Sequence, residues 1–345
     1  MELLKQLVET PGIPGREERI RTLIKKEMEK LADEVRVDAL GNVIGLKRGK
    51  GNGKKVMLAA HMDEIGFLVS HIEDKGFLRL SPAGGFDPRT MVAQRVMVHG
   101  RKDLPGVLMP GVKPIHLQGP EDGKTPLKVS DFFVDLGLDK EEVEKHVRIG
   151  DYVTIHREYA EIGNLISAKA MDDRAGVWVM LEALRQVGEH EVDIYAVATV
   201  QEEVGLRGAT TGAYGIQPDL GVALDVTLAL DVPGGVKSSQ ISALGDGPAI
   251  KIMDSASISN YKLVDFMRDV AEKHEVKFQM EILPRGGTDA GAIERAHSGC
   301  PVITLSIPTR YVHSNVETIS KTDIQATAKL LARFLEEAHA GDFAL

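Results

Sequence analysis

Apolar runs and amphipathic segments alternate along the second half of the chain. The run VDIYAVATV at 192–200 is almost continuously apolar, which is typical of a strand covered on both faces. Residues 172–187 repeat apolar side chains at helical spacing, and helices are also expected at about 259–274 and 321–339. Further strands are expected at 165–169, 218–226, 247–253, 276–282 and 301–307. This alternation predicts an α/β fold in which helices sandwich a sheet.

The first part of the chain begins in the same way and then changes. Residues 16–34 have the spacing of an amphipathic helix, and strand-like runs follow. The glycine-rich residues 49–54, between two of these runs, predict a hairpin turn. From about 67 to 158 the chain shows short strands joined by turns, such as FLVSHI and GFLRL around EDKG. We therefore predict a small all-β module at 67–158, inserted into an α/β domain that is made of 1–66 and 159–345.

Composition excludes several classes of function. Lys plus Arg number 42 and Asp plus Glu 51, for a formal net charge of −9. Such a chain is poorly suited to bind nucleic acid or an anionic membrane surface. No apolar run approaches the ~18–20 residues that span a bilayer, and no secretory signal is evident, so we expect a cytoplasmic protein. Cys300 is the only cysteine; any bound metal would therefore need nitrogen and oxygen ligands.

Histidines and carboxylates stand at the ends of the expected strands, where open α/β sheets bind ligands. In AAHMDEIG, His61 ends a strand and Asp63 comes two residues later. Imidazole is a good metal ligand, and a carboxylate often holds its second nitrogen, which is a role suited to Asp63. Taken alone, this pattern is more typical of a strand-end histidine and a turn aspartate.

Two acidic pairs follow other strands. Asp172 and Asp173 in AMDDRAG precede a helix, where an acidic pair is also typical of a helix N-terminus. Glu202 and Glu203 in VATVQEEVG directly follow the apolar run at 192–200. Adjacent residues of an extended backbone point to opposite sides, so one glutamate can bind metal while the other acts as a general base. Two solvated loop glutamates are an equally good interpretation.

Two more residues complete the set of candidates. Asp225 lies in the apolar run GVALDVT, and His313 follows the run PVITLSI. A carboxylate buried in such a strand is costly unless it is paired or binds metal. Together, the two histidines and the carboxylates suit zinc, cobalt or manganese. The excess of carboxylates favours two metals with a shared carboxylate, as in two-metal hydrolases.

The loop PRGGTDAG at 284–291 places two glycines before Thr288 and Asp289. It lacks the Gly-Lys-Ser/Thr ending of a phosphate loop. One interpretation is a helix start with Asp289 near its N-terminus. The other is a loop whose backbone approaches a ligand closely, with Thr288 and Asp289 as substrate-binding residues.

Several strings together resemble a known family. AAHMDEIGF, AMDDRAG, VATVQEEVGLRGA, ALDVT, GGTDAGAI and SIPTRYVHSN are similar to the tetrahedral (TET) aminopeptidases, di-metal peptidases also labelled glutamyl aminopeptidases or endoglucanases. The similarity covers nearly the whole chain, in order and at matching spacing. It implies a zinc-peptidase-like α/β/α sandwich with an inserted β-barrel-like dimerisation domain. It also implies a metal-dependent aminopeptidase that removes N-terminal residues from peptides.

The resemblance implies two divalent metal ions per subunit, zinc or cobalt and possibly manganese. The implied roles are one metal on His61 and Asp225, the other on Glu203 and His313, a bridge from Asp172, general-base catalysis by Glu202 and orientation of His61 by Asp63. The choice of Asp172 over Asp173, and of Glu203 over Glu202, rests on the family and not on spacing.

The family also implies an assembly. Its inserted domain forms dimers, and the dimers form a hollow tetrahedral homododecamer. Residues 110–130 hold four prolines with little periodicity, predict a mobile surface loop, and resemble the family loop that reaches a neighbouring active site. Three other interpretations stay open: a glycosidase that uses Glu202 with a second carboxylate, a di-metal carboxypeptidase, and a non-catalytic shell protein. The preferred N-terminal residue and the native metal are left open.

Overall fold

The computed structural model describes residues 1–51, 53–120, 122 and 125–345. Its α-helices are α1 (Glu2–Glu9), α2 (Glu18–Met28), α3 (Lys140–His146), α4 (Met171–Gln186), α5 (Arg207–Ile216), α6 (Tyr261–Lys273), α7 (Ala290–Glu294) and α8 (Lys321–Glu337). None of the helices in these residues is long and apolar enough to span a bilayer.

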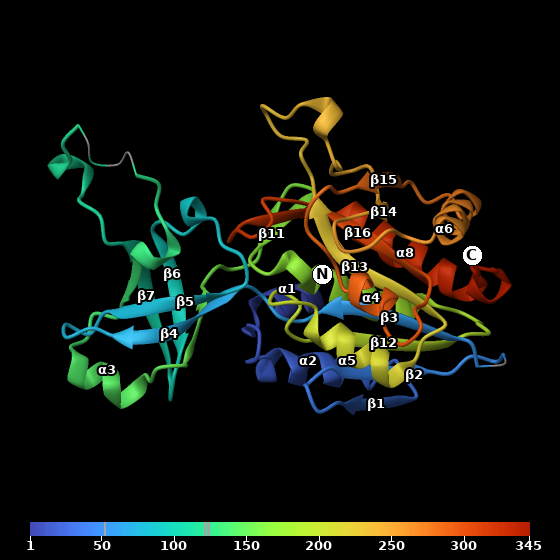
Figure 1. Ribbon diagram of the computed structural model, residues 1–345, viewed down its shortest axis with the longest axis horizontal. Coiled ribbons are helices and arrows are strands. Elements are labelled where there is room, and N and C mark those ends of the chain that lie inside the picture. The colour runs from blue at the N-terminus through green and yellow to red at the C-terminus, as the bar shows by residue number, and fades with distance from the viewer. Residues whose placement is uncertain (52, 121, 123–124) are drawn as a thin grey trace.

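A large mixed sheet forms the body of the molecule (Figure 1). Its main path runs β1-β2-β12-β3-β13-β16-β17-β11-β10, and β14 joins β16 to β15. The four central strands, β12, β3, β13 and β16, are mutually parallel. The strand bounds are β1 (Glu34–Val37), β2 (Val43–Lys47), β3 (Lys55–His61), β10 (Ala160–Ile162), β11 (Leu165–Ala168), β12 (Asp193–Thr199), β13 (Leu220–Leu228), β14 (Ala249–Met253), β15 (Gln279–Ile282), β16 (Val302–Arg310) and β17 (Glu317–Ser320).

Helices cover both faces of this sheet, which confirms the predicted α/β/α sandwich. Alternate residues of β3 pack to opposite sides: Leu58 lies in the core shared with α1, α2, α4, α6 and α8, and Ala59 lies in the core beneath α5 and α7. The central strands are therefore apolar at nearly every position, because a two-residue period fills two cores at once.

The hairpin predicted at residues 49–54 is wrong. Strand β2 pairs antiparallel with β12, and β3 pairs with β12 in parallel on its other side. The segment that joins β2 to β3 therefore passes over β12 and is not a tight turn between paired strands; residue 52 within it lies outside the described residues. Strand β12, which is distant in the sequence, therefore lies between β2 and β3, which follow each other in the sequence.

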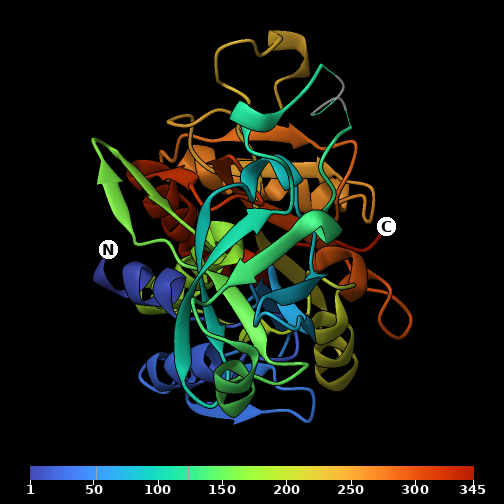
Figure 2. The same cartoon turned by 90° about the vertical axis from the view of Figure 1, so that its left-hand side faces the viewer.

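A closed barrel stands to one side of the sheet (Figure 1), and Figure 2 views the molecule from the barrel side. It follows the order β4-β5-β8-β7-β6-β9 and has its own apolar core. The predicted hairpin forms, since β4 pairs antiparallel with β5, and β6 and β7 form a second one. The strand bounds are β4 (Gly66–Ile72), β5 (Leu78–Ala83), β6 (Gln94–His99), β7 (Asp103–Pro110), β8 (Phe132–Asp135) and β9 (Tyr152–Ile155).

The segment expected as a mobile surface loop, 110–130, connects β7 to β8 and is only partly described. Residues 121, 123 and 124 lie outside the described residues. In the described part, Ile115 and Leu117 belong to a short 3-10 turn and are 77% and 71% exposed. These apolar side chains point to solvent in the isolated chain.

Candidate metal centre

The carboxyl ends of the central strands bring the predicted ligands together. His61 is the last residue of β3, Asp225 lies in the neighbouring β13, and Glu203 follows β12 on the other side of β3. Asp172 opens α4 directly after β11, and His313 follows β16. Two groups have ligand atoms within 4.8 Å of one another: His61 with Asp173 and Asp225, and His61 with Asp172 and Glu203. Parallel strands produce this convergence because their carboxyl ends share one edge.

The Asp172 carboxylate faces both histidines. Its Oδ1 is 2.9 Å from His61 Nε2, and its Oδ2 is 3.3 Å from His313 Nε2. His313 Nε2 is also 3.4 Å from Glu203 Oε1. Zinc binds nitrogen and oxygen at about 2.0–2.2 Å, so two ligands of one ion lie about 3–3.5 Å apart. The separations around Asp172 match that spacing on each side.

The imidazole of His61 is oriented by Asp63. Its Nδ1 lies 3.0 Å from the backbone oxygen of Asp63. A carbonyl oxygen only accepts hydrogen bonds, so Nδ1 carries a proton, and Nε2 is the ring nitrogen that faces Asp172 and that a cation would bind. The Asp63 carboxylate is 3.7 Å from the same Nδ1. It accepts the backbone N–H groups of Glu202 and Glu203 at 3.1 and 3.2 Å. Asp63 thus fixes His61 through its carbonyl and the glutamate loop through its carboxylate.

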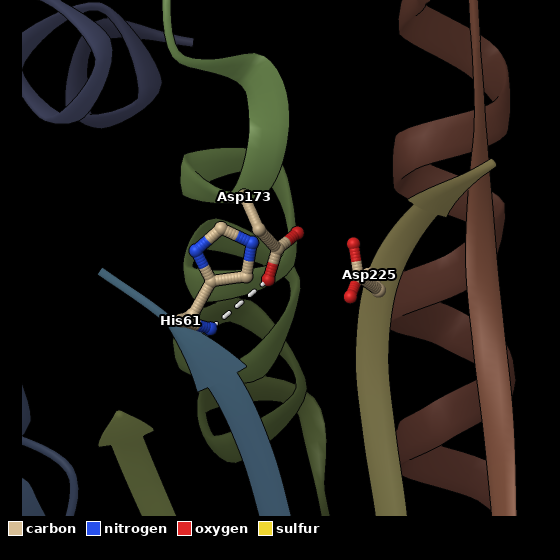
Figure 3. Close-up of side chains that lie close together, drawn as sticks. All are labelled: His61, Asp173 and Asp225. Atoms are coloured by element: carbon tan, nitrogen blue, oxygen red, sulfur yellow. Dashed lines mark hydrogen bonds between the residues drawn. The ribbon is translucent and has the colours of Figure 1, made fainter. Parts of the chain in front are cut away.

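Asp173 and Asp225 also lie close to His61 (Figure 3). Asp173 accepts the backbone N–H of His61 at 3.2 Å and that of Gly176 at 2.9 Å. Both of its oxygens therefore serve the backbone, one on β3 and one in the first turn of α4. This arrangement explains why an acidic pair begins the helix: the second aspartate holds the strand and the helix together.

Burial strongly perturbs the titration of this cluster. It raises the pKa of Glu202, Asp173 and Asp225 well above the ordinary range, and neighbouring carboxylates raise these pKa values further. Burial lowers the pKa of His313, but the carboxylates of Asp172 and Glu203, 3.3 and 3.4 Å from its Nε2, outweigh it and raise that pKa to about 12. The carboxylates outnumber the two imidazoles, so the positive charge of the imidazoles does not balance the cluster.

The donor set fits divalent cations. Glu203 Oε1 is buried and makes no hydrogen bond among the described residues; His313 Nε2 is 3.4 Å away. A buried carboxylate oxygen without a hydrogen bond is costly, and a divalent cation in front of it would remove that cost. Nitrogen and oxygen donors without thiolates suit zinc, cobalt or manganese. His61, Asp172, Glu203, Asp225 and His313 are the residues that would hold such ions.

A cleft of about 770 Å³ opens over the centre. Its floor includes the five candidate ligands His61, Asp172, Glu203, Asp225 and His313, together with the Glu202 side chain. Glu202 Oε2 lies 3.9 Å from His61 Nε2. The adjacent glutamates therefore both face the centre, and a substrate in the cleft would contact the side of the ligand cluster that carries Glu202.

Comparison with known proteins identifies the family. A family profile described as M42 glutamyl aminopeptidase matches residues 41–330, which is most of the chain. This chain belongs to the M42 glutamyl aminopeptidase family. The lysyl aminopeptidase of Pyrococcus furiosus is 40% identical over 349 residues, covering 99% of this chain and 98% of that protein.

Solved structures agree with the M42 assignment. An aminopeptidase from the archaeon Desulfurococcus kamchatkensis has a TM-score of 0.93 and 44% identity, with 97% of this chain and 94% of that one covered. The TET1 peptidase of Pyrococcus horikoshii, described as able to assemble into a tetrahedron or a large octahedral shell, has a TM-score of 0.86 and 34% identity, with 97% and 99% covered. The resemblance to TET aminopeptidases is thereby confirmed, and these relatives support a peptide-bond hydrolase.

The two predicted substrate-binding residues in the glycine-rich loop of this M42 family member lie in different surroundings. Thr288 lines the cleft, with its hydroxyl 2.9 Å from that of Thr304. Asp289 is buried beside the cleft and accepts the Thr199 hydroxyl at 2.6 Å; it is not among the residues that line the cleft. Burial raises the pKa of Asp289 to about 6. Contact with substrate stays a prediction for both.

Sequence reasoning missed Glu317, which connects two of the candidate ligands. Its carboxylate accepts the backbone N–H of His313 at 2.7 Å and that of Asp172 at 3.0 Å. His313 has φ of 59°, a left-handed conformation that is unfavourable for a residue other than glycine. Glu317 is 2% exposed, and burial raises its pKa to about 8. The only local signal was a glutamate four residues after a candidate ligand.

Proposed function

We propose that this chain is a dinuclear metallo-aminopeptidase that removes N-terminal residues from peptides. The observation that carries the proposal is the Asp172 carboxylate, which faces His61 with one oxygen and His313 with the other. We assign Asp172 as the bridge, His61 and Asp225 to one cation, and Glu203 and His313 to the other. The names of the relatives favour cleavage at the N-terminus.

Glu202 is the proposed general base. It lines the cleft and is not needed as a ligand, and its Oε2 lies 3.9 Å from His61 Nε2, which keeps it next to the proposed cations. A general base must lie within reach of the proton that it accepts. The chemistry that divalent cations supply in such a site is polarisation of the scissile carbonyl and activation of a water. Glu202 takes the proton of that water and delivers it to the leaving amine.

Asp63 and Glu317 act as positioning residues in this scheme. Asp63 holds the backbone of both glutamates, so the base and its neighbouring ligand keep a fixed relation to His61. Glu317 joins the loop of His313 to the start of α4. Catalytic geometry of this kind tolerates only small displacements, which gives both buried carboxylates a purpose.

The barrel, built from strands between Gly66 and Ile155, is proposed as the inserted dimerisation domain, at 67–158 of the chain. The Pyrococcus horikoshii relative described as able to assemble into a tetrahedron or a large octahedral shell, together with a similar structure described as a dodecamer, supports a homododecamer of this chain. A monomeric mass in light scattering would contradict the assembly but leave the proposed chemistry intact.

Chromogenic aminoacyl substrates with added zinc, cobalt or manganese test the activity. We expect hydrolysis of these substrates that a chelator abolishes. A peptide with a free N-terminus should also be cleaved, and the same peptide with an acetylated N-terminus should not. Cleavage from the carboxyl end of the acetylated peptide would favour the carboxypeptidase. Turnover of glycans that survives the chelator would favour the glycosidase, and no turnover of any substrate would favour a shell protein without activity.

A further inference from the structure

We infer that the cleft selects peptides whose N-terminal residue has an uncharged aliphatic side chain. This inference rests on the proposed function and names its substrate class. Beyond the metal centre, aliphatic side chains from β13 and from the loops near it form a wall of the cleft, beside smaller polar residues and glycines. The aliphatic side chains are Leu206, Val226, Leu228, Leu230, Ile241, Leu283 and Val312.

Two of these side chains set where the aliphatic wall begins. Val226 directly follows Asp225, and Val312 directly precedes His313. The apolar lining therefore starts beside the ligands themselves. An N-terminal residue bound with its amine and carbonyl at the centre would direct its side chain along this wall. Transfer of an apolar side chain from water to such a surface is favourable.

The described cleft lining offers a basic substrate side chain no carboxylate outside the metal centre. Among the described residues that line the cleft, the carboxylates are Asp172, Glu202, Glu203 and Asp225, and all of these belong to the metal centre. A lysyl ammonium on the aliphatic wall would lose its hydration without gaining a partner, which is strongly unfavourable. The lining therefore disfavours basic N-terminal residues.

The buried cation of the cleft lining, Lys251, is already neutralised by neighbouring carboxylates. Lys251 lines the cleft but is 1% exposed. Its Nζ lies 3.2 Å from Glu281 Oε1 and 3.4 Å from Asp254 Oδ2, and the Thr227 hydroxyl donates to the same Glu281 oxygen at 2.6 Å. With two carboxylates against it, Lys251 offers no free charge to an acidic substrate.

The remaining basic residue of the lining is Arg285, which is exposed. Interactions of exposed charges are weakened by water and salt, so Arg285 contributes little to selection of a glutamyl residue. The M42 family is described as glutamyl aminopeptidases, and the Pyrococcus furiosus relative is named a lysyl aminopeptidase. Membership in the family therefore does not specify which N-terminal side chain is preferred, and we infer the preference from the lining of this cleft.

The test compares kcat/KM of the full-length protein, with zinc or cobalt, on leucyl, lysyl and glutamyl p-nitroanilides. We expect the leucyl substrate to exceed both charged ones by more than about tenfold, since even one methylene in an apolar pocket gives ~10–200-fold. A lysyl or glutamyl substrate in first place overturns this inference and leaves the proposed function standing. No hydrolysis of any substrate overturns both.

A charge placed on the wall tests the location. Leu283→Glu should raise the lysyl-to-leucyl ratio of kcat/KM by at least about tenfold, because the new carboxylate pairs with the ammonium. The matched control is Met280→Glu, which adds the same charge on β15 outside the cleft lining and should keep the wild-type ratio. Since both substrates are measured on one sample, loss of folded protein cancels from the ratio.

An unchanged ratio in Leu283→Glu, or an equal rise in the Met280→Glu control, overturns the placement of the substrate side chain on this wall. If Leu283→Glu loses all activity, Ile241→Glu carries the same charge to another residue of the wall and is judged by the same ratio. A rise in that variant supports the inference, and an unchanged ratio overturns it.

Discussion

Two buried charge clusters lie within a few residues of each other, and they solve the same physical problem differently. The acidic cluster is the candidate metal centre, in which carboxylates outnumber histidines. The ion-pair cluster consists of Glu64, Lys169 and Arg174. Glu64 directly follows Asp63, and Lys169 lies three residues before Asp172, so the two clusters share the same loops.

The charges of the ion-pair cluster meet partners within the chain, and only one polar atom of its side chains, Arg174 Nε, makes no hydrogen bond among the described residues. Lys169 Nζ donates to both oxygens of Glu64, at 2.7 and 2.6 Å. Arg174, which has no exposed surface, lies 3.8 Å from Glu64 and donates to the backbone oxygens of Leu7, Thr10 and Gly12. Each charge meets an opposite charge or several dipoles, as burial requires.

The acidic cluster has no such internal solution. Several of its carboxyl pKa values are raised by burial, and one Glu203 oxygen makes no hydrogen bond in the part of the chain that the structure describes. The comparison shows that this chain can neutralise buried charge with its own side chains, as it does in the ion-pair cluster. In the acidic cluster the carboxylates are left without enough opposite charge, so cations from outside the chain would have to balance them. That is expected of a binding site and not of a structural core.

The largest expected effect is a loss of kcat without a loss of zinc binding. Glu202→Gln should lower kcat by about 10²–10⁴-fold, since the base is lost, while zinc binding measured by calorimetry stays close to wild type. The neighbouring Glu203→Gln is the matched variant and should weaken zinc binding instead. Near-wild-type turnover of Glu202→Gln would show that the base is elsewhere.

Breaking the ion-pair cluster should affect stability. Lys169→Met leaves Glu64 buried without its main partner and should cost about 3–5 kcal/mol of unfolding free energy, read from guanidinium unfolding. The double variant Glu64→Gln with Lys169→Met should recover part of the loss. Lys140→Met, which removes an exposed lysine 3.1 Å from Asp74, is the control and should leave the midpoint unchanged. Equal midpoints for Lys169→Met and wild type would contradict the comparison.

Glu17 is an intermediate case, a buried acid whose nearest cation, Arg21, is 3.9 Å away. Burial raises its pKa from 4.5 to about 7. Its stabilising contribution is therefore complete below pH 4.5 and is lost as the pH rises through 7. Glu17→Gln keeps the protonated-like form and should be more stable than wild type by up to about 3 kcal/mol at pH 8. Near pH 4.5 the two proteins should unfold at similar denaturant concentrations; a pH-independent difference would refute this assignment.

The smallest expected effect concerns the support of the acidic cluster. Glu317→Gln weakens the hold on the backbone of His313 and Asp172 and should reduce zinc affinity about 10–100-fold, as loss of an outer partner commonly does. Calorimetry with zinc measures this effect without reference to activity. Glu189→Gln, at a residue whose side chain is 86% exposed, is the control. Equal zinc affinity in Glu317→Gln and wild type would show that Glu317 has no such role.

Much of the fold was predictable because local spacing reflects burial. Helical repeats and continuously apolar runs located α4 and β12, and the shift to short hairpins marked the region that forms the barrel. Strand order was not predictable in the same way. Hydrogen bonds between strands are not encoded by the residues that link them, so the glycines at 49–54 gave no sign that β12, from residues 193–199, pairs between β2 and β3.

By itself, the sequence determined which residue types stand at the strand ends, and hence the candidate metal ligands and the family. Only the tertiary structure decided how those residues face one another: the Asp172 carboxylate between two histidines, the carbonyl of Asp63 on His61, and the aliphatic wall of the cleft. The physical reason is range. Backbone periodicity acts over a few residues, whereas a coordination shell and a substrate pocket form from side chains that are far apart in the sequence and are brought together when the sheet is buried.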